Sequence, residues 1–83
     1  MAEREIGRVT HYFGKIGVAV IELTDALKVG DTIRIRGTTT DFEQQVGSME
    51  IEHQSIEQAE AGQEIAVKVG YRVRRKDKVF KIE

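Results

Sequence analysis

The feature that most limits the fold of this 83-residue chain is a strict alternation of apolar and polar residues. It runs through Thr32–Arg36 and again through Ile65–Val69. Because successive side chains of a strand point to opposite faces, such segments form strands with one buried face. No long segment shows the period of about 3.6 residues that an amphipathic helix requires. We therefore expect an all-β fold.

Six segments carry the strand signature, and turns rich in glycine and aspartate separate them. The expected strands are Gly7–Phe13, Ile16–Leu23, Thr32–Arg36, Phe42–His53, Ile65–Val69 and Val79–Ile82. Short strands at this spacing predict a six- to seven-stranded closed antiparallel β-barrel, because closure leaves no exposed sheet edge. We expect residues 1–83 to form this single domain, since the length suffices for only one.

Three segments carry more detailed expectations. Ile16–Leu23 is apolar on both faces, which predicts a central strand that is covered on both sides. Gly47 lies in the middle of the long segment Phe42–His53 and predicts a bulge or a corner where one strand bends between two sheets. Ser55–Ala59 begins with a serine cap and carries a glutamine at its fourth position, which predicts a short helical turn.

The composition limits the covalent chemistry and the location of the chain. It has no cysteine, so apolar burial and backbone pairing must hold the fold without disulfides. The charged start Met1–Glu5 does not resemble a secretory signal, and no stretch of about 18 apolar residues could cross a membrane. We therefore expect a cytoplasmic protein with no membrane partner.

Charge is distributed unevenly, although the net charge is only −1. Asp41–Glu64 contains seven acidic residues and no lysine or arginine, whereas Lys68–Lys81 contains seven basic residues and one acid, Asp77. Two interpretations remain open. The segments form solvated faces that attract each other across the sheet, or they give the molecule an electrical direction that orients a partner.

No arrangement of residues points to catalysis or to a metal site. His11 and His53 are 42 positions apart and have no cysteine partner, whereas zinc needs three or four ligands. Ser48 and Ser55 lack the neighbours of an activated nucleophile. Since no glycine-rich loop is present to cradle a phosphate, we expect no enzyme, no metal, no nucleotide and no other cofactor.

Binding is the remaining class of function, and the basic residues indicate a ligand. Arginine and lysine neutralise phosphates and release counterions, which favours nucleic acid. We expect one basic surface, formed by Arg34, Arg36, Arg72, Arg74, Arg75, Lys76 and Lys78. Tyr12, Phe13 and Tyr71 could stack on single-stranded bases. In the alternative interpretation Phe13 packs in the core and Tyr71 anchors a loop. The overall pI of about 6.1 does not favour a dedicated nucleic-acid binder.

Several segments together resemble the second domain of translational GTPases such as elongation factor Tu. In order, they are the opening strand Ile6–Val9, the lysine-valine-glycine-acid hairpin Leu27–Ile35, the long strand at Ser48–Ile51 and the alanine-glycine turn within Ala59–Val67. The resemblance implies an elongation factor domain 2-like β-barrel over Ile6–Ile82. Since no Gly-x-x-x-x-Gly-Lys-Ser/Thr motif occurs, it implies no GTPase cycle.

The stretch Val9–Val20 resembles two narrower groups more closely. These are small free-standing elongation-factor-like proteins of prokaryotes and the C-terminal barrel of the collagenase-like peptidase family. In that peptidase family the catalytic part is a separate upstream domain, and some members are linked to hydroxylation of RNA. The resemblance therefore implies an accessory barrel and not the active enzyme.

The elongation-factor resemblance also implies a pocket that borders the terminal adenosine of aminoacyl-tRNA. By alignment, its border positions fall on Glu50, His53 and Lys68. Glu50 keeps the glutamate of that family, whereas His53 replaces an arginine and Lys68 replaces an apolar residue.

Two functions follow from these observations. The first is a non-catalytic binding module that contacts RNA, either tRNA or rRNA, or a ribosome-associated protein. The alternative is an accessory docking barrel for a collagenase-like peptidase or an RNA-hydroxylating enzyme. Salt distinguishes them, because contacts to phosphate weaken steeply with added salt and apolar docking barely changes.

Overall fold

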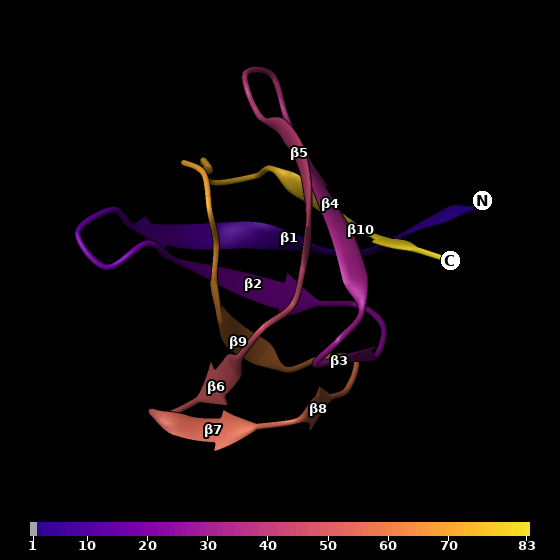
Figure 1. Ribbon diagram of the computed structural model, residues 1–83, viewed down its shortest axis with the longest axis vertical. Helices are drawn as coiled ribbons and strands as arrows, with labels where there is room; N and C mark the ends of the chain where they lie inside the picture. Colours follow the sequence, from indigo (N-terminus) through magenta and orange to yellow (C-terminus); the bar gives the residue numbers. More distant parts are fainter. Residues whose placement is uncertain (1) are drawn as a thin grey trace.

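The computed structural model describes residues 2–83, and this part of the chain forms ten strands and no helix (Figure 1). The strands are β1 Glu3–Phe13, β2 Val18–Leu23, β3 Leu27–Lys28, β4 Thr32–Arg36, β5 Asp41–Gln45, β6 Met49–Ile51, β7 Gln54–Ile56, β8 Gln58–Ala59, β9 Glu64–Lys68 and β10 Lys78–Ile82. Within the same residues there is accordingly no helix that could cross a membrane. The all-β prediction is confirmed.

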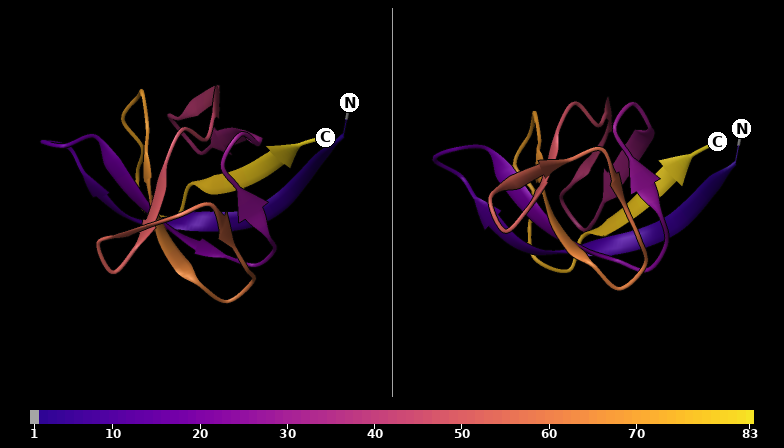
Figure 2. Two further views of the ribbon diagram at one scale, coloured as in Figure 1. Left: turned by 60° about the horizontal axis from the view of Figure 1, so that its bottom comes forward. Right: turned by 90° about the horizontal axis from the view of Figure 1, so that it is seen from below.

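Eight strands form one strongly curved sheet in the order β5-β4-β10-β1-β2-β9-β6-β7, and β3 pairs with β8 separately (Figure 2). All pairings of neighbouring strands are antiparallel, as predicted. The sheet is not closed, because its edge strands β5 and β7 share no ladder of hydrogen bonds within residues 2–83. The prediction of a closed barrel of six to seven strands is therefore wrong.

A side chain and a turn, and not a strand ladder, bridge the opening of the sheet. The chain crosses from β5 to β6 at residues 46–48, where the backbone N of Val46 donates to the turn before β4 at 2.8 Å. The Gln44 side-chain amide donates to the Lys68 carbonyl oxygen and accepts from the Gly70 backbone N, both at 2.9 Å. These bonds satisfy backbone groups that a closing ladder would otherwise have to pair.

The inward side chains of the curved sheet form one hydrophobic core. Ile33 and Ile35 of β4 and Val67 of β9 are completely buried, as the alternation predicted. The buried apolar side chains are Ile6, Val9, Ala19, Ile21, Leu23, Leu27, Ile33, Ile35, Val46, Met49, Ala59, Ile65, Val67, Val69, Val73 and Val79. Burial of each large one contributes about 1.5–3 kcal/mol, so this core is the main stabilising element of a chain without disulfides.

The more detailed local predictions had different outcomes. The prediction at Gly47 is wrong, because Gly47 lies in the connection between β5 and β6, which are separate strands of the same sheet. β2 is central, between β1 and β9, but Val18 and Val20 on its outer face are only half-buried. The prediction that both faces are covered is therefore wrong. The predicted helical turn at Ser55–Ala59 is also wrong, because pairing of β7 with β6 and of β8 with β3 outweighs the local capping signal.

Candidate functional site

A shallow groove runs over the outer face of β2 and β9, between the β1–β2 and β6–β7 hairpins. The strand register pairs Val20 with Ala66 and Val18 with Lys68, so these side chains share the outer face. We call this feature the outer groove. It consists of two adjoining hollows of about 280 and 470 Å³, which share the lining residues Phe13, Glu50, His53 and Ala66.

The tip of the β1–β2 hairpin forms one rim of the outer groove and projects from the rest of the sheet (Figure 1). Phe13 is 52% exposed and Ile16 is 63% exposed. The alternative interpretation in which Phe13 packs in the core is therefore wrong. Large apolar side chains that remain exposed beside a groove are typical of a surface that contacts another protein.

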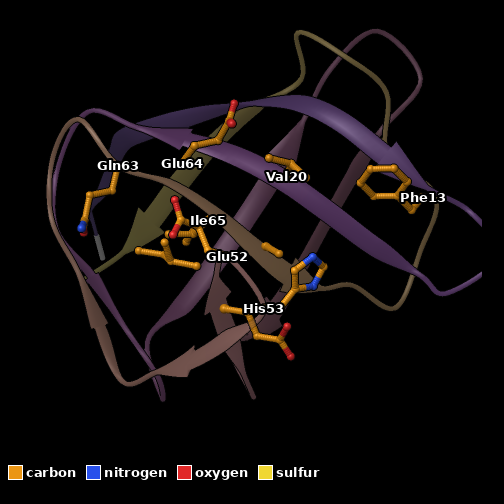
Figure 3. Close-up of a pocket in the computed structure, with 10 residues that line it drawn as sticks. Phe13, Val20, Glu52, His53, Gln63, Glu64 and Ile65 are labelled. Atoms are coloured by element: carbon orange, nitrogen blue, oxygen red, sulfur yellow. The ribbon is translucent and has the colours of Figure 1, made fainter.

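The opposite rim is a turn with unusual backbone geometry. Glu52 and His53 join β6 to β7 and have φ angles of 50° and 66°. Two consecutive positive φ angles define a type I′ turn, which favours asparagine and glycine. A residue with a side chain costs about 1–2 kcal/mol in this left-handed region. Figure 3 shows Glu52 and His53 between Phe13 at one end of the groove and Gln63 at the other. The sequence thus retains two strained side chains at the groove.

Acidic side chains accompany the apolar lining. Glu50, Glu52 and Glu64 all line the larger hollow, and the Glu64 carboxylate accepts a hydrogen bond from the Thr10 hydroxyl at 3.1 Å. Lys68 lies at the end of the smaller hollow.

The three positions implied by the elongation-factor resemblance come together in the outer groove. Glu50 of β6, His53 of the turn and Lys68 of β9 all line its smaller hollow. The apolar residues of the groove, such as Val18, were not predicted as site residues from the sequence. The sequence signal that could have identified them is the second apolar face of Ile16–Leu23. We interpreted that face as covered, whereas it lines an exposed groove.

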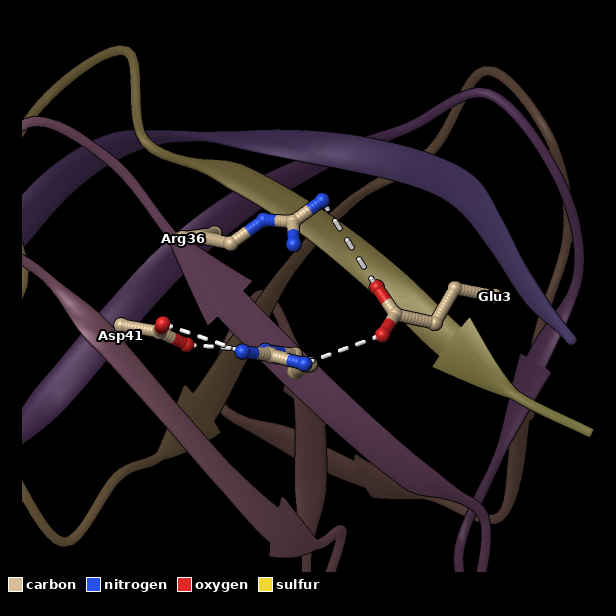
Figure 4. Close-up of polar contacts among 4 residues, drawn as sticks. Glu3, Arg36 and Asp41 are labelled. Atoms are coloured by element: carbon tan, nitrogen blue, oxygen red, sulfur yellow. Dashed lines mark hydrogen bonds and ion pairs between the residues drawn. The ribbon is translucent and has the colours of Figure 1, made fainter. Parts of the chain in front are cut away.

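The basic residues of β4 lie in a paired arginine cluster, formed by Arg34, Arg36, Glu3 and Asp41 (Figure 4). Arg34 holds Asp41 through two hydrogen bonds of 2.8 and 3.0 Å and reaches Glu3 at 3.1 Å. The hydrogen bonds from Arg34 keep the pKa of Asp41 below its ordinary value, and those to Asp41 raise the pKa of Arg34. The Arg34 charge is thus already matched within the protein.

Arg36 is held less tightly than Arg34. Its guanidinium lies 3.8 Å from the Glu3 carboxylate and 4.8 Å from the centre of the Phe80 ring. Lys78 of β10 is directly opposite Arg36 in the strand register. Arg36 and Lys78 are therefore neighbours on the outer face of the sheet.

The remaining predicted basic residues lie in the segment before β10, in separate surroundings. Arg72 lines a hollow together with Tyr71, whose ring packs at 5.0 Å against the ring of Phe42. Arg74 is exposed at the start of a turn. A different hollow of about 210 Å³, which we call the cationic hollow, lies beside β1 and is surrounded by Arg8, His11, Arg75 and Lys76.

The two histidines belong to different surfaces. His11 borders the cationic hollow and His53 borders the outer groove. Across residues 2–83, no three histidine, cysteine or acidic side chains are grouped so that they could hold a metal ion.

Sequence comparison finds larger proteins that contain a similar segment, although no protein-family model matches the chain. The chain is 47% identical over 77 residues to an uncharacterized protease of Methanocaldococcus jannaschii, which covers 92% of this chain and 19% of that protein. It is 36% identical over 80 residues to a collagenase of Porphyromonas gingivalis, which covers 94% of this chain and 22% of the collagenase. The chain thus spans about a fifth of the length of the curated relatives it matches.

Structural comparison finds the same fold in a solved domain. The C-terminal domain of a putative U32 peptidase of Geobacillus thermoleovorans superposes with a TM-score of 0.90 and 19% identity, over 96% of this chain and 93% of that one. The predicted resemblance to the C-terminal barrel of collagenase-like peptidases is supported by these findings. The predicted resemblance to domain 2 of elongation factor Tu receives no support from them.

Proposed function

We propose that the chain is a non-catalytic docking domain, which binds the catalytic part of a collagenase-like peptidase through the outer groove. One observation carries this proposal. A chain of 83 residues matches nearly all of a solved C-terminal peptidase domain but only about a fifth of the length of the protease and collagenase relatives. The similarity therefore covers one folding unit of a larger enzyme.

The chemistry of the outer groove agrees with a docking role. Phe13 and Ile16 are exposed anchors, and such apolar side chains supply most of the affinity in protein interfaces when a partner buries them. Glu50, Glu52 and Glu64 select a partner segment with lysine or arginine beside its apolar side chain. Within residues 2–83, no hydrogen bond or ion pair joins His53 to Glu50 or Glu52, so we assign the groove a role in contact and not in bond cleavage.

The docking function replaces the translational binding module as the main interpretation. The relatives are named as proteases and collagenases, and none of these names refers to translation. Contact with nucleic acid does not depend on the elongation-factor resemblance, and the basic residues Arg8, Arg75 and Lys76 lie outside the outer groove.

Calorimetric titration tests the docking function. The probe is the part of the Methanocaldococcus jannaschii protease that remains after its matching 77-residue segment is deleted. We expect this chain to bind the probe with an affinity that falls only modestly with salt, because apolar anchors supply most of the affinity and the glutamates a smaller part. The variant Ile16→Asp should weaken binding at least about tenfold, since it places a charge in the apolar contact.

Val29→Asp is the matched control. Val29 is also an exposed large hydrophobic residue, at 39%, but it does not line the outer groove. The Val29→Asp variant should bind the probe with the affinity of the unmodified chain. Absence of a complex, or equal weakening by Ile16→Asp and Val29→Asp, would contradict docking through the groove.

A further inference from the structure

The cationic hollow lies between β1 and a rigid turn formed by residues 74–77. The backbone N of Lys76 donates to the Val9 carbonyl oxygen, and the backbone N of Val9 donates to the Asp77 carbonyl oxygen, both at 2.8 Å. The Asp77 carboxylate is buried and accepts a hydrogen bond of 2.8 Å from the first backbone N of the turn. The basic side chains are thus presented by a backbone that is already ordered, which lowers the entropy lost on binding.

The charges around this hollow are largely uncompensated. Within residues 2–83, Arg75 and Lys76 make no ion pair, and Arg8 has only a long contact of 3.7 Å to the Glu22 carboxylate. Arg34, in contrast, holds two carboxylates. Like charges that are gathered without partners repel one another, so an anion that enters the hollow is stabilised by several of them at once.

The backbone of Lys76 provides a second, independent observation. Lys76 has a φ angle of 76° and is the third residue of a turn closed by a hydrogen bond from the Asp77 N to the Arg74 carbonyl oxygen. This position of a type II turn favours glycine, because a side chain is strained there. Strained residues that persist in folded proteins cluster at functional sites. The chain keeps a positive charge where glycine would be more stable.

The neighbouring rings indicate which kind of anion fits. The ring of His11 lies 6.4 Å from that of Phe13, with an angle of 24° between their planes, and both side chains are exposed. An aromatic platform beside cations is the arrangement that binds single strands, since bases stack on the rings while the cations hold phosphates. We propose that the cationic hollow binds the phosphate backbone of a single-stranded nucleic acid, with the His11–Phe13 pair as its stacking surface.

Salt dependence gives the first measurable consequence. Arg8, Arg75 and Lys76 can each neutralise one phosphate. With about 0.7 counterions released for each contact to a single strand, three contacts predict an affinity that falls about 20-fold between 50 and 200 mM salt. The docking contact of the outer groove should weaken much less over the same range, because apolar side chains supply most of its affinity.

The test is fluorescence anisotropy with a labelled oligouridylate of about 15 nucleotides, a length that spans such a site. Lys76→Gly should weaken binding about tenfold in 50 mM salt, through loss of a charge-assisted contact. The same variant should raise the melting temperature by about 5 °C, because glycine relieves the strained turn. A substitution that damaged the fold would instead lower both affinity and melting temperature.

Lys28→Ala in β3 is the matched control, since it removes one positive charge from the separate β3–β8 pair and Lys28 does not line the hollow. It should bind the oligouridylate like the unmodified chain. Equal weakening by Lys28→Ala and Lys76→Gly, or no binding in 50 mM salt, would overturn the proposal. Poly-glutamate should compete poorly with the oligouridylate. Equal competition would also overturn the proposal, in favour of an acidic peptide as the ligand.

Discussion

The paired arginine cluster and the cationic hollow contain the same residue types, yet their electrostatic states are opposite. Arg34 is joined to Glu3 and Asp41 by hydrogen bonds of 2.8 to 3.1 Å. Arg75 and Lys76 make no ion pair among the residues that the structure describes. A matched charge has little to gain from a ligand, whereas an unmatched charge does.

A similar contrast exists among the apolar residues, which are buried in the core in one region and exposed at the outer groove in the other. Ile35 of β4 is completely buried beneath the paired arginine cluster, whereas Ile16 is 63% exposed at the rim of the outer groove. The groove also contains the strained residues Glu52 and His53. One region therefore serves mainly stability, and the other retains features that reduce stability and suit binding.

The largest difference should come from one substitution made in both regions. Ile35→Ala should reduce the free energy of unfolding by about 3 kcal/mol, because it leaves a cavity in the core. Ile16→Ala should change it by less than about 0.5 kcal/mol, since the side chain is already in water. Urea unfolding of the two variants measures both values. Similar losses would show that the hairpin tip is part of the core.

The contact between Gly37 and the Asp77 side chain should be nearly as sensitive. A Cβ atom at Gly37 would fall within 1.9 Å of an Asp77 carboxylate oxygen, and that carboxylate is buried and hydrogen-bonded. Gly37→Ala should therefore reduce the free energy of unfolding by about 2 kcal/mol. Urea unfolding measures it, with Gly47→Ala as the control, because no atom lies within 4 Å of a Cβ at Gly47. A smaller loss at Gly37 than at Gly47 would contradict the close contact.

A third variant should raise stability on the binding side alone. The double substitution Glu52→Asn and His53→Gly supplies the residues that a type I′ turn favours. Since both φ angles are positive, we expect a gain of about 1 kcal/mol in the free energy of unfolding. The affinity for the peptidase probe should fall at the same time, because two groove side chains are lost. Thermal melting and calorimetric titration measure the two effects, and a loss of stability would disagree with the assigned strain.

The smallest effect concerns the pH dependence of the paired arginine cluster. Hydrogen bonds from Arg34 lower the pKa of Asp41 in the folded state. This contribution to stability is present above the unfolded pKa of about 4 and is lost as the pH falls through the folded pKa. Asp41→Asn should therefore reduce the fall in melting temperature between about pH 5 and pH 2. The reduction should be small, since the Asp41 side chain is 54% exposed. An unchanged fall would show that the pair adds nothing to stability.

The strands that the sequence predicted correctly are those with clear alternation. Thr32–Arg36 agrees with β4 at both ends, and Ile65–Val69 agrees with β9 to within one residue. Ser55–Ala59 was predicted as a helical turn, because a serine cap is a local signal. Its strand pairing depends on distant partners, such as Leu27 opposite Ala59, which no local pattern reveals.

The candidate site was predictable only in part. Glu50, His53 and Lys68 followed from a resemblance, and the structure brings them into one hollow. Arg75 and Lys76 were predicted as binding residues, but their grouping with Arg8 and His11 was not, because it depends on a strand pairing between the two ends of the chain. Such a contact depends on the register of the strand pair and on the conformation of the turn, and the pattern of charges in the sequence predicts neither.

The sequence by itself determined the direction of each side chain in the regular strands, because the alternation of Cβ atoms is a local property of the backbone. It also excluded disulfides, since no cysteine is present. Only the tertiary structure decided that the sheet remains open and that Glu3 matches Arg34 while Lys76 stays unmatched. The physical reason is that these features depend on contacts between residues far apart in the sequence. Which distant segments come into contact determines an ion pair or a sheet edge, and those contacts are determined by the fold of the whole chain.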